Sequence, residues 1–426
     1  MKLEADFGVN NYDPLPVVLS SGKGVHVTDV EGKTYYDFLS AYSAVNQGHC
    51  HPRLVEAVKK QSETLTLTSR AFFNDKLGPY AKFMCETFGF DRMLPMNTGV
   101  EGGESAVKLA RRWAYDVKGV PADQAVTVFA HGNFWGRTLG AISSSDDPAA
   151  RGGFGPFLPG YASVPFNDLP ALEEMFKSNP NIAAFMVEPI QGEAGVVVPS
   201  EGYLAGVRAL CDKYNVLWIA DEVQSGLGRS GRLLAVDWEG VRPDLVILGK
   251  ALSGGMMPVS AVLGKAEVME TLQPGQHGST YGGNPLACVV ATEAVKVLME
   301  EGLVQRSDEL GQTLRKTLAG LVSGDSVTET HVAAGEGRDP VLSHVSGGTG
   351  LVQEVRGLGL FNALVVRPDA PDGQDAAALC AEFMRRGLLA KPTQKHVIRF
   401  APPLTLSSEQ LEEAADIIVQ SVRALE

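Results

Sequence analysis

The amino-acid sequence predicts an α/β protein in which helices flank a mostly parallel central sheet, joined to a smaller α+β domain. Short apolar runs alternate with helical stretches between residues 51 and 290. Such alternation is typical of parallel strands connected by helices that cover both faces of a sheet. Beyond residue 290, strand signals come in neighbouring pairs between helices, which indicates a second unit. With 426 residues the chain is long enough for two domains.

Composition narrows the class of protein. Hydrophobic residues make up 44% of the chain and charged residues 20%, as in an ordinary globular enzyme. The net charge of −13 argues against nucleic acid or an anionic membrane as a partner, and no apolar stretch approaches the length that spans a bilayer. Five cysteines at irregular spacing fit reduced thiols. The N-terminal residues lack the pattern of a targeting peptide. We therefore expect a cytoplasmic protein, or one of the mitochondrial matrix if the chain is trimmed.

The expected elements follow in chain order. Residues 1–50 predict an N-terminal arm with short strands around the turn DVEGK (29–33). Residues 51–290 predict the large domain, with a helix over 101–119 that the pair Asn97-Thr98 would cap and Gly119 would end. Its strands are expected at RMLPMN (92–97), AVTVFA (125–130), AAFMVEPI (183–190), VLWIADE (216–222), LVILGKAL (245–252) and PVSAVLG (258–264).

The C-terminal part, residues 291–426, predicts the smaller α+β domain. A helical segment runs to about residue 300 and a second one continues from there. Residues 322–350 are rich in Gly, Ser and Thr, and this composition predicts a flexible surface loop insertion. Strand signals resume within 351–366 and 396–404, and helices are expected around 374–387 and 407–424.

Two residues at the ends of apolar runs carry the strongest chemical signal. Asp221 ends one run and Lys250 ends the next, 29 residues later (250 − 221 = 29). Burial lowers the pKa of an amine, and a neutral amine can condense with a carbonyl. A carboxylate can keep the pyridine nitrogen of pyridoxal 5'-phosphate (PLP) protonated. A lone lysine after an apolar run is more often a solvated one, so the pair is what points to PLP.

A set of ordered motifs surrounds this pair: MNTGVE (96–101), GNFWGRT (132–138), VEPIQGEAGV (187–196), IADEVQSGLGRSG (219–231), LGKALSGG (248–255) and GSTYGGNPL (278–286). Together they resemble the class III (subgroup II) aminotransferases of fold type I. The segments NYDPLPVVL, SAYSAVNQGHCHP, LTLTSRAFFND and AKPTQKHVIRFAPPL resemble the ornithine aminotransferases within that family. The resemblance runs from about residue 10 to the C-terminus, and only residues 322–350 look longer than is usual.

The resemblance implies PLP as cofactor and a role for each matching residue. Lys250 would carry the cofactor as a Schiff base and shuttle a proton, while Asp221 would face the pyridine nitrogen. The other cofactor contacts would be Gly99 and Val100 at the phosphate, Phe134 stacked on the ring, Gln224 at the ring hydroxyl, and Thr280 at the phosphate of the neighbouring subunit. Read without the resemblance, these residues would be a capped surface helix, a core aromatic and an ordinary turn.

The resemblance also implies which residues bind the substrates. Arg137 would bind a substrate carboxylate, and Tyr12 the α-amino group of ornithine. Tyr42 would shape the pocket against other amines. Glu193 would mask Arg399 in one half-reaction and swing away in the other, so that the α-carboxylate of a 2-oxo dicarboxylate can bind; a static ion pair is the other reading. Two positions depart from the family: an aspartate at 13 in place of histidine, and Gly102 in place of alanine.

The implied activity is ornithine δ-aminotransferase, in which L-ornithine and 2-oxoglutarate give glutamate 5-semialdehyde and L-glutamate by a ping-pong mechanism. The implied assembly is a homodimer with active sites at the subunit interface, its further assembly left open. One alternative is another ω-aminotransferase, acting on N-acetylornithine or 4-aminobutyrate. Another is a cofactor-free binding protein for a nucleotide or small molecule. His49, Cys50 and His51 have no partner residues at metal-ligand spacing, so we expect no metal.

Overall fold

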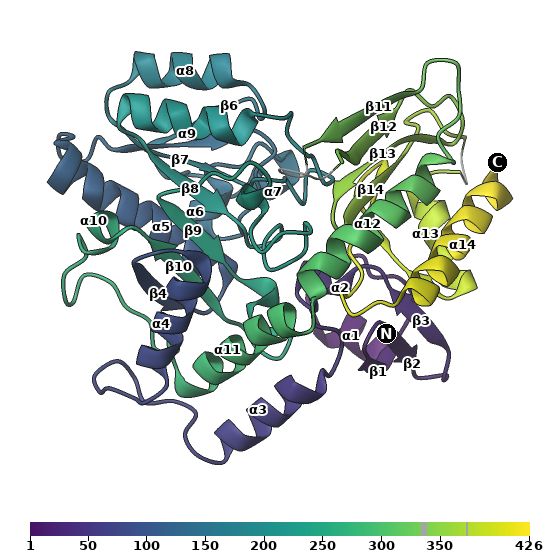
Figure 1. Cartoon of the computed structure of the whole chain (residues 1–426), viewed down its shortest axis with the longest axis horizontal. Coiled ribbons are helices and arrows are strands. Elements are labelled where there is room, and N and C mark those ends of the chain that lie inside the picture. The colour runs from purple at the N-terminus through teal and green to yellow at the C-terminus, as the bar shows by residue number, and fades with distance from the viewer. Residues whose placement is uncertain (334–338, 372–373) are drawn as a thin grey trace.

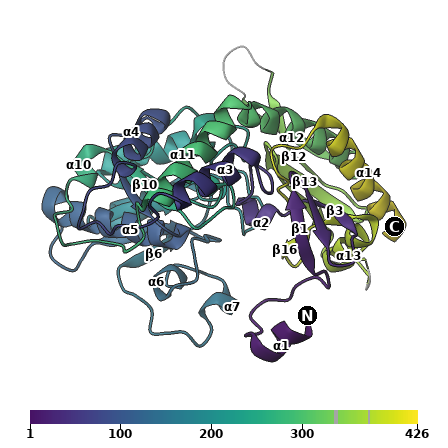
Figure 2. The same ribbon diagram turned by 90° about the horizontal axis from the view of Figure 1, so that it is seen from below.

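The structure is a computed structural model that describes residues 1–333, 339–371 and 374–426. A seven-stranded sheet with its helices forms one side of the molecule, and a six-stranded sheet with three helices forms the other (Figure 1). The helices α11 (Pro285–Glu300) and α12 (Leu303–Ala319) connect the two sides. Figure 2 shows the N-terminal helix α1 (Lys2–Phe7) extending away from the rest of the chain.

The central sheet has the strand order β4-β10-β9-β8-β7-β5-β6, and only β10 runs antiparallel to its neighbours. All six predicted strands are present. The sequence reasoning missed β6, a short edge strand whose first three residues are only partly buried. The strands are β4 (Arg92–Met96), β5 (Val126–Ala130), β6 (Tyr161–Val164), β7 (Ile182–Val187), β8 (Leu217–Asp221), β9 (Leu245–Leu248) and β10 (Ser260–Gly264).

Helices cover both faces of this sheet, which explains why β7, β8 and β9 are buried along their whole length. Successive residues of a strand point to opposite faces. Ile247 accordingly packs in the cluster that contains α5, while Val246 packs in the cluster on the other face. The covering helices include α3 (Pro52–Ser62), α4 (Leu77–Phe88), α5 (Gly99–Trp113), α8 (Leu169–Ser178) and α9 (Tyr203–Tyr214).

Helix α5 begins as the sequence predicts. The Thr98 side chain accepts the N–H of Glu101, and the Glu101 carboxylate accepts the N–H of Thr98 in return. A π-helical turn follows the helix and ends at Gly119, whose φ is +82°. The departure at Gly102 has a packing reason, because a Cβ there would lie 2.7 Å from Cγ2 of Ile247. Glycine thus lets the start of α5 lie close against β9.

The second main sheet is antiparallel, with the order β11-β12-β13-β14-β17-β16. Helix α12 packs against β12, β13 and β14, and α14 packs against α12 and α13. The elements are β11 (Thr328–Val332), β12 (Val341–Ser346), β13 (Val352–Leu358), β14 (Phe361–Val366), β16 (Lys391–Gln394), β17 (Val397–Phe400), α13 (Ala376–Arg386) and α14 (Ser408–Leu425).

The interpretation of residues 322–350 as a flexible loop was wrong for residues 328–332 and 341–346, which form strands. The strands β11 and β12 lie within it and pair with each other at the edge of the sheet. Val341, Leu342 and Val345 are buried there, in the strand β12. The Gly-, Ser- and Thr-rich composition of the whole segment hid these short apolar stretches. Residues 334–338 of the segment lie outside the described residues.

The N-terminal segment joins the smaller unit, as expected. Its strands form a four-stranded sheet with β15 (Leu388–Leu389), which pairs in parallel with β3. The proposed domain boundary at residue 290 falls inside α11, which is continuous and packs against α3 and α4. We propose that the boundary lies at Gly302, whose φ of +64° breaks the path between α11 and α12. The N-terminal strands are β1 (Leu19–Lys23), β2 (His26–Asp29) and β3 (Thr34–Asp37).

A buried arginine holds the two units and the N-terminal segment together. Arg229, in the loop after β8, is fully buried. Its Nη1 donates to the carbonyl oxygens of Leu360 (2.9 Å) and Pro402 (2.6 Å), and its Nη2 donates to Oδ1 of Asn46 (2.6 Å). Burial lowers the pKa of Arg229 to about 9.

No helix in the described part of the chain has the length and apolar character needed to cross a membrane.

A left-handed turn, α2 (Ser40–Ser43), carries Tyr42. All four residues have positive φ, from +48° to +70°, and none is glycine. The Asp37 carboxylate holds the start of the turn by accepting the N–H groups of Leu39 (3.0 Å) and Ser40 (2.8 Å). Left-handed backbone costs an L-residue roughly 1–2 kcal/mol, so this turn stores strain beside the site described below.

We predict that Ala41→Gly stabilises the protein, because glycine adopts positive φ without a steric penalty. Ala41 is exposed, so its methyl group contributes little packing. The expected gain in the free energy of unfolding is about 1 kcal/mol, measured by denaturant titration. Ala44→Gly is the matched control, because Ala44 has a φ of −90° and the substitution should destabilise. A loss of stability in Ala41→Gly would contradict the strained turn.

Candidate active site

The candidate site lies where the parallel strands of the central sheet end. Asp221 is the last residue of β8, and Lys250 follows β9 after one glycine. Because the carboxyl ends of parallel strands meet at one edge, residues far apart in sequence converge here. A cavity of about 200 Å³ brings together six of the sequence-predicted residues: Gly99, Val100, Phe134, Asp221, Gln224 and Lys250.

Lys250 is held in an unusual backbone conformation inside this cavity. Its φ is +45°, a value that costs a non-glycine residue energy and that clusters at functional sites. Burial lowers the pKa of Lys250. The carboxylates of Glu193 and Asp221 act in the opposite direction, and the guanidinium of Arg399 adds to the lowering. The net effect favours a neutral amine that can attack a carbonyl.

Asp221 shares its buried position with a second acid that the sequence reasoning missed. Burial raises the pKa of both Asp221 and Glu188, and the Asp221 charge raises that of Glu188 further. The two oxygens of Glu188 accept the N–H groups of Phe134 (3.0 Å) and Gly192 (3.0 Å). Glu188 thus joins the loop that carries Phe134 to the loop that carries Glu193. Its position directly after the buried strand β7 was the available signal.

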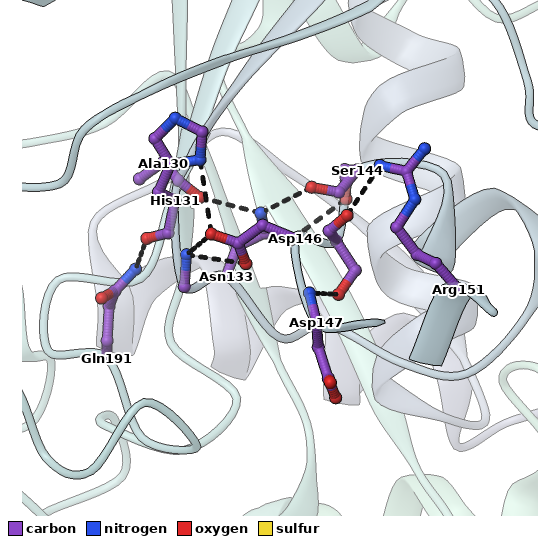
Figure 3. A network of polar contacts seen from close by, with 10 residues as sticks. Ala130, His131, Asn133, Ser144, Asp146, Asp147, Arg151 and Gln191 are labelled. Carbon is purple, nitrogen blue, oxygen red and sulfur yellow. Dashed lines mark hydrogen bonds and ion pairs between the residues drawn. The ribbon is translucent and has the colours of Figure 1, made fainter. Parts of the chain in front are cut away.

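A network of polar contacts fixes the loop that carries Phe134 and Arg137 (Figure 3). Asn133 donates to the carbonyl oxygens of Ala130 (2.8 Å) and Ser144 (3.0 Å). The Asp146 carboxylate accepts the N–H of Gly132 (3.0 Å). The neighbouring Trp135 is a core residue whose Nε1 donates to Oγ of Ser144 (2.8 Å). The aromatic ring of Phe134 therefore faces the cavity from a rigid support.

The opposite wall of the cavity is the N-terminus of α5. The first N–H groups of a helix have no partner within it, so those of Gly99 and Val100 are free to bind an anion. The helix dipole favours negative charge at the same place. A Cβ at Gly99 would lie 3.0 Å from Cγ1 of Val223, which shows how closely this end approaches the loop after Asp221.

Glu193 and Arg399 form an ion pair at the rim of the cavity, and Gln224 is part of it. Arg399 is fully buried, and its Nη1 donates to Oε1 of Glu193 (2.9 Å) and to Oε1 of Gln224 (2.9 Å). Nε2 of Gln224 donates to Glu193 (3.2 Å). Burial alone would raise the pKa of Glu193, but Arg399 lowers it, so the acid is ionised. Nε and Nη2 of Arg399 are buried without a partner among the described residues, as expected of a guanidinium that awaits a ligand.

Tyr42 lies against this pair, and Tyr12 approaches from the N-terminal arm. The guanidinium of Arg399 is 5.3 Å from the centre of the Tyr42 ring. Burial raises the pKa of Tyr42, and the charge of Tyr12 would raise it further. The two tyrosines therefore lie near each other. Tyr12 is 68% exposed, and Lys391 donates to the carbonyl oxygen of the neighbouring Asp13.

Two further predicted residues, Arg137 and Thr280, also do not line the cavity within this chain. Arg137 is exposed, with its guanidinium 5.2 Å from the centre of the Phe134 ring. Thr280 is exposed on a loop whose Ser279 accepts a hydrogen bond from Asn97 (2.9 Å). Of the residues that we discounted, His49 pairs with Asp37 and His51 with Glu301.

The residues present fit PLP. Asp221 is a buried carboxylate on the cavity wall with Oδ1 bound by the N–H of Val223 (3.0 Å), and Lys250 offers an amine on the same wall. The start of α5 suits a phosphate, and Phe134 offers an aromatic face between them. One cavity therefore presents a base, an acid, an anion site and an aromatic ring, the four contacts that a phosphorylated pyridine aldehyde requires.

Comparison with known proteins agrees with this geometry. The chain is 54% identical over 98% of its length to the ornithine aminotransferase, mitochondrial, of Rattus norvegicus, and covers 89% of that protein. The structure matches that of an ornithine aminotransferase from Toxoplasma gondii, described with partial occupancy of PLP at its active site, with a TM-score of 0.92. That protein is 47% identical, and the match covers all of this chain and 93% of the other.

A second similar solved structure carries the name of a different aminotransferase. It is the acetylornithine aminotransferase of Elizabethkingia anophelis, 47% identical, with a TM-score of 0.84 over 99% of this chain and 98% of the other. The family model for aminotransferase class-III matches residues 7–335 and 341–422. The chain therefore belongs to the class-III aminotransferase family and is a PLP-dependent aminotransferase.

Proposed function

We propose that this aminotransferase transfers the δ-amino group of L-ornithine to 2-oxoglutarate, giving glutamate 5-semialdehyde and L-glutamate. The observation that carries the proposal is the pair Glu193–Arg399, buried beside Lys250 and covered by Tyr42. Such a pair lets one pocket accept first an amine and then a dicarboxylate. The relative from Rattus norvegicus, named for this activity, supports the choice of ornithine.

The protein's contribution to the reaction begins with Lys250 and Asp221. PLP, when bound, supplies an aldehyde and a ring that withdraws electrons from the reacting carbon. Asp221 would keep the ring nitrogen protonated, and the N–H groups of Gly99 and Val100 would hold the phosphate. Nζ of Lys250, whose pKa burial lowers, would take a proton from the reacting carbon and later return it, as general base and then acid.

The change of substrate between the two half-reactions depends on Glu193. With Glu193 in place, its carboxylate offsets the charge of Arg399, and ornithine places its distal amine near Lys250 while its carboxylate reaches Arg137. When 2-oxoglutarate enters, its α-carboxylate replaces Glu193 at Arg399. Gln224 keeps one hydrogen bond to Arg399 during the exchange, which reduces the cost of uncovering a buried cation.

We also propose a homodimer in which Thr280 binds the phosphate of the neighbouring site. Thr280 is exposed and lies outside the cavity of its own chain, which supports a role in another subunit. Phe72, Phe73 and Tyr281 are exposed aromatic residues in the segments around it, as expected of an interface. Sedimentation of the holoenzyme at a mass near 45.3 kDa, that of one chain, would contradict the dimer.

The second candidate function is N-acetylornithine aminotransfer, which the structure from Elizabethkingia anophelis favours by its name and its 47% identity. Tyr42 supports ornithine instead, because its ring narrows the pocket next to Arg399. For location we propose the cytoplasm. The relative from Rattus norvegicus is named mitochondrial, so imaging of the tagged protein in mitochondria would overturn that location.

The proposed substrate predicts the order of rates in single-turnover reactions of the PLP form. Ornithine should react fastest, and N-acetylornithine and 4-aminobutyrate at least about tenfold more slowly, because one poorly fitting group costs roughly 1–3 kcal/mol. Loss of the visible absorbance of the cofactor reports each rate. Faster reaction of N-acetylornithine than of ornithine would favour the second candidate.

The switch predicts that Glu193→Ala impairs the ornithine half-reaction more than the glutamate half-reaction. Without the acid, Arg399 competes with Arg137 for the carboxylate of ornithine, and kcat/KM should fall about tenfold or more. The glutamate half-reaction needs Arg399 uncovered and should change less. Glu193→Gln is the matched variant that keeps a hydrogen-bonding group beside Gln224. Equal losses in both half-reactions would indicate a static pair.

The lowered pKa of Lys250 predicts a pH-dependent cost to the stability of the cofactor-free protein. Between the folded value and the unfolded value near 10.4, the unfolded chain binds more protons, so the free energy of unfolding rises with pH. Lys250→Met should therefore stabilise the apoprotein at pH 7, by an amount that shrinks as pH approaches 10. Urea unfolding of both proteins measures the difference, and a constant difference would show that Lys250 does not titrate in this way.

A further inference from the structure

The two arginines that would bind substrate carboxylates have opposite surroundings. Arg399 is fully buried and hydrogen-bonded to Glu193 at 2.9 Å. Arg137 is 62% exposed, and its nearest acid is Asp147, with 3.9 Å between Nη1 and Oδ2. No hydrogen bond joins the Arg137 side chain to any other residue that the structure describes, beyond its contact with the Phe134 ring. Asp147 thus lies close enough to offset the charge of Arg137 without occupying its donors.

The position of the Asp147 carboxylate is fixed by the chain around it. Asp147 caps the short helix α7 (Pro148–Arg151), and its Oδ1 accepts the N–H of Ala149 (2.9 Å). Its own N–H donates to Oγ of Ser145 (3.2 Å), as Figure 3 shows. One carboxylate oxygen is therefore committed to the cap while the other faces Arg137. The acid cannot follow the guanidinium when a ligand draws it away.

We propose that Asp147 is the weak counterpart of Glu193: it competes with the substrate carboxylate for Arg137, and so determines how strongly that carboxylate binds. This inference rests on the proposed function in one respect, that Arg137 receives a substrate carboxylate. An exposed ion pair contributes at most about 1 kcal/mol, whereas separating a buried pair costs considerably more.

The difference in strength between the Arg137–Asp147 pair and the Arg399–Glu193 pair determines the order in which the carboxylates of a substrate bind. A substrate with one carboxylate binds at Arg137, because displacing Asp147 costs less than displacing Glu193. A dicarboxylate fills Arg137 first, and only its second carboxylate displaces Glu193 from Arg399. The pocket thereby accepts ornithine and 2-oxoglutarate in turn without a rearrangement of Arg137. Asp147 is a specificity-determining residue that the family motifs did not indicate.

The test measures binding of glutarate, a dicarboxylate that cannot react, to the holoenzyme by calorimetry. Asp147→Asn removes the charge and keeps the helix cap, because asparagine caps as well as aspartate. We expect the Kd of glutarate to fall about two- to fivefold. Asp147→Ser, which also caps, should give the same result if the asparagine variant folds poorly. Turnover of 1,4-diaminobutane, which is ornithine without its carboxylate, should not improve.

Two controls separate this competition from a general effect of charge. Asp116→Asn removes an acid from a pair of similar exposure, with Arg112 at the end of α5, and should leave the Kd of glutarate unchanged. Asp147→Glu keeps the charge and should leave the Kd near that of the wild type. An unchanged Kd in Asp147→Asn, or an equal fall in Asp116→Asn, would overturn the inference. Glutarate binding needs no turnover, so a different preferred amine would refute the proposed function and leave this test intact.

Discussion

The buried guanidinium of Arg229 is the constraint on which the active site depends. It belongs to the loop after β8, yet its hydrogen bonds end on Asn46, Leu360 and Pro402. A buried cation is costly without hydrogen-bond acceptors, so the three segments that supply acceptors to Nη1 and Nη2 meet at this point, while Nε has no hydrogen-bond partner among the described residues. Pro402 follows Arg399 by three residues, and Asn46 follows Tyr42 by four. These hydrogen bonds therefore bring Arg399 and Tyr42, the candidate substrate-binding residues of the smaller unit, to the strand ends of the larger one.

Burial shifts the pKa values of the ionisable groups in the site, and neighbouring charges shift them further. Asp221 and Glu188 are buried near each other, and burial raises the pKa of both. Lys250 is buried too, and its pKa is lowered. The pKa of Glu193 is lowered in spite of burial, chiefly because Arg399 faces it. A protonated pyridine ring held by Asp221 would add a positive charge beside the two buried acids and so offset part of the cost of burying them.

Backbone strain is concentrated around the candidate active site. The left-handed turn with Tyr42 and the positive φ of Lys250 both lie at the cavity, where surrounding hydrogen bonds hold them. Glu188 connects two loops in a similar way, since its carboxylate accepts the N–H groups of Phe134 and of Gly192, the residue before Glu193. These features are invisible in a residue pattern, because a dihedral angle and a shared acceptor depend on neighbours that the pattern does not contain.

The sequence by itself predicted the parallel sheet and the cap of α5, and it singled out Lys250, Asp221, Phe134, Glu193 and Arg399 as candidate site residues. These features are local: an apolar run, a capping motif or a family motif carries its own signal. The tertiary structure alone decided that Glu188 lies beside Asp221, that Gln224 joins the Glu193–Arg399 pair, and that residues 322–350 contain two strands. It also decided that Asp147 approaches Arg137. Each of these features depends on contacts between segments that are separated in sequence. Burial and hydrogen-bond geometry determine those contacts, and both exist only once the chain has folded.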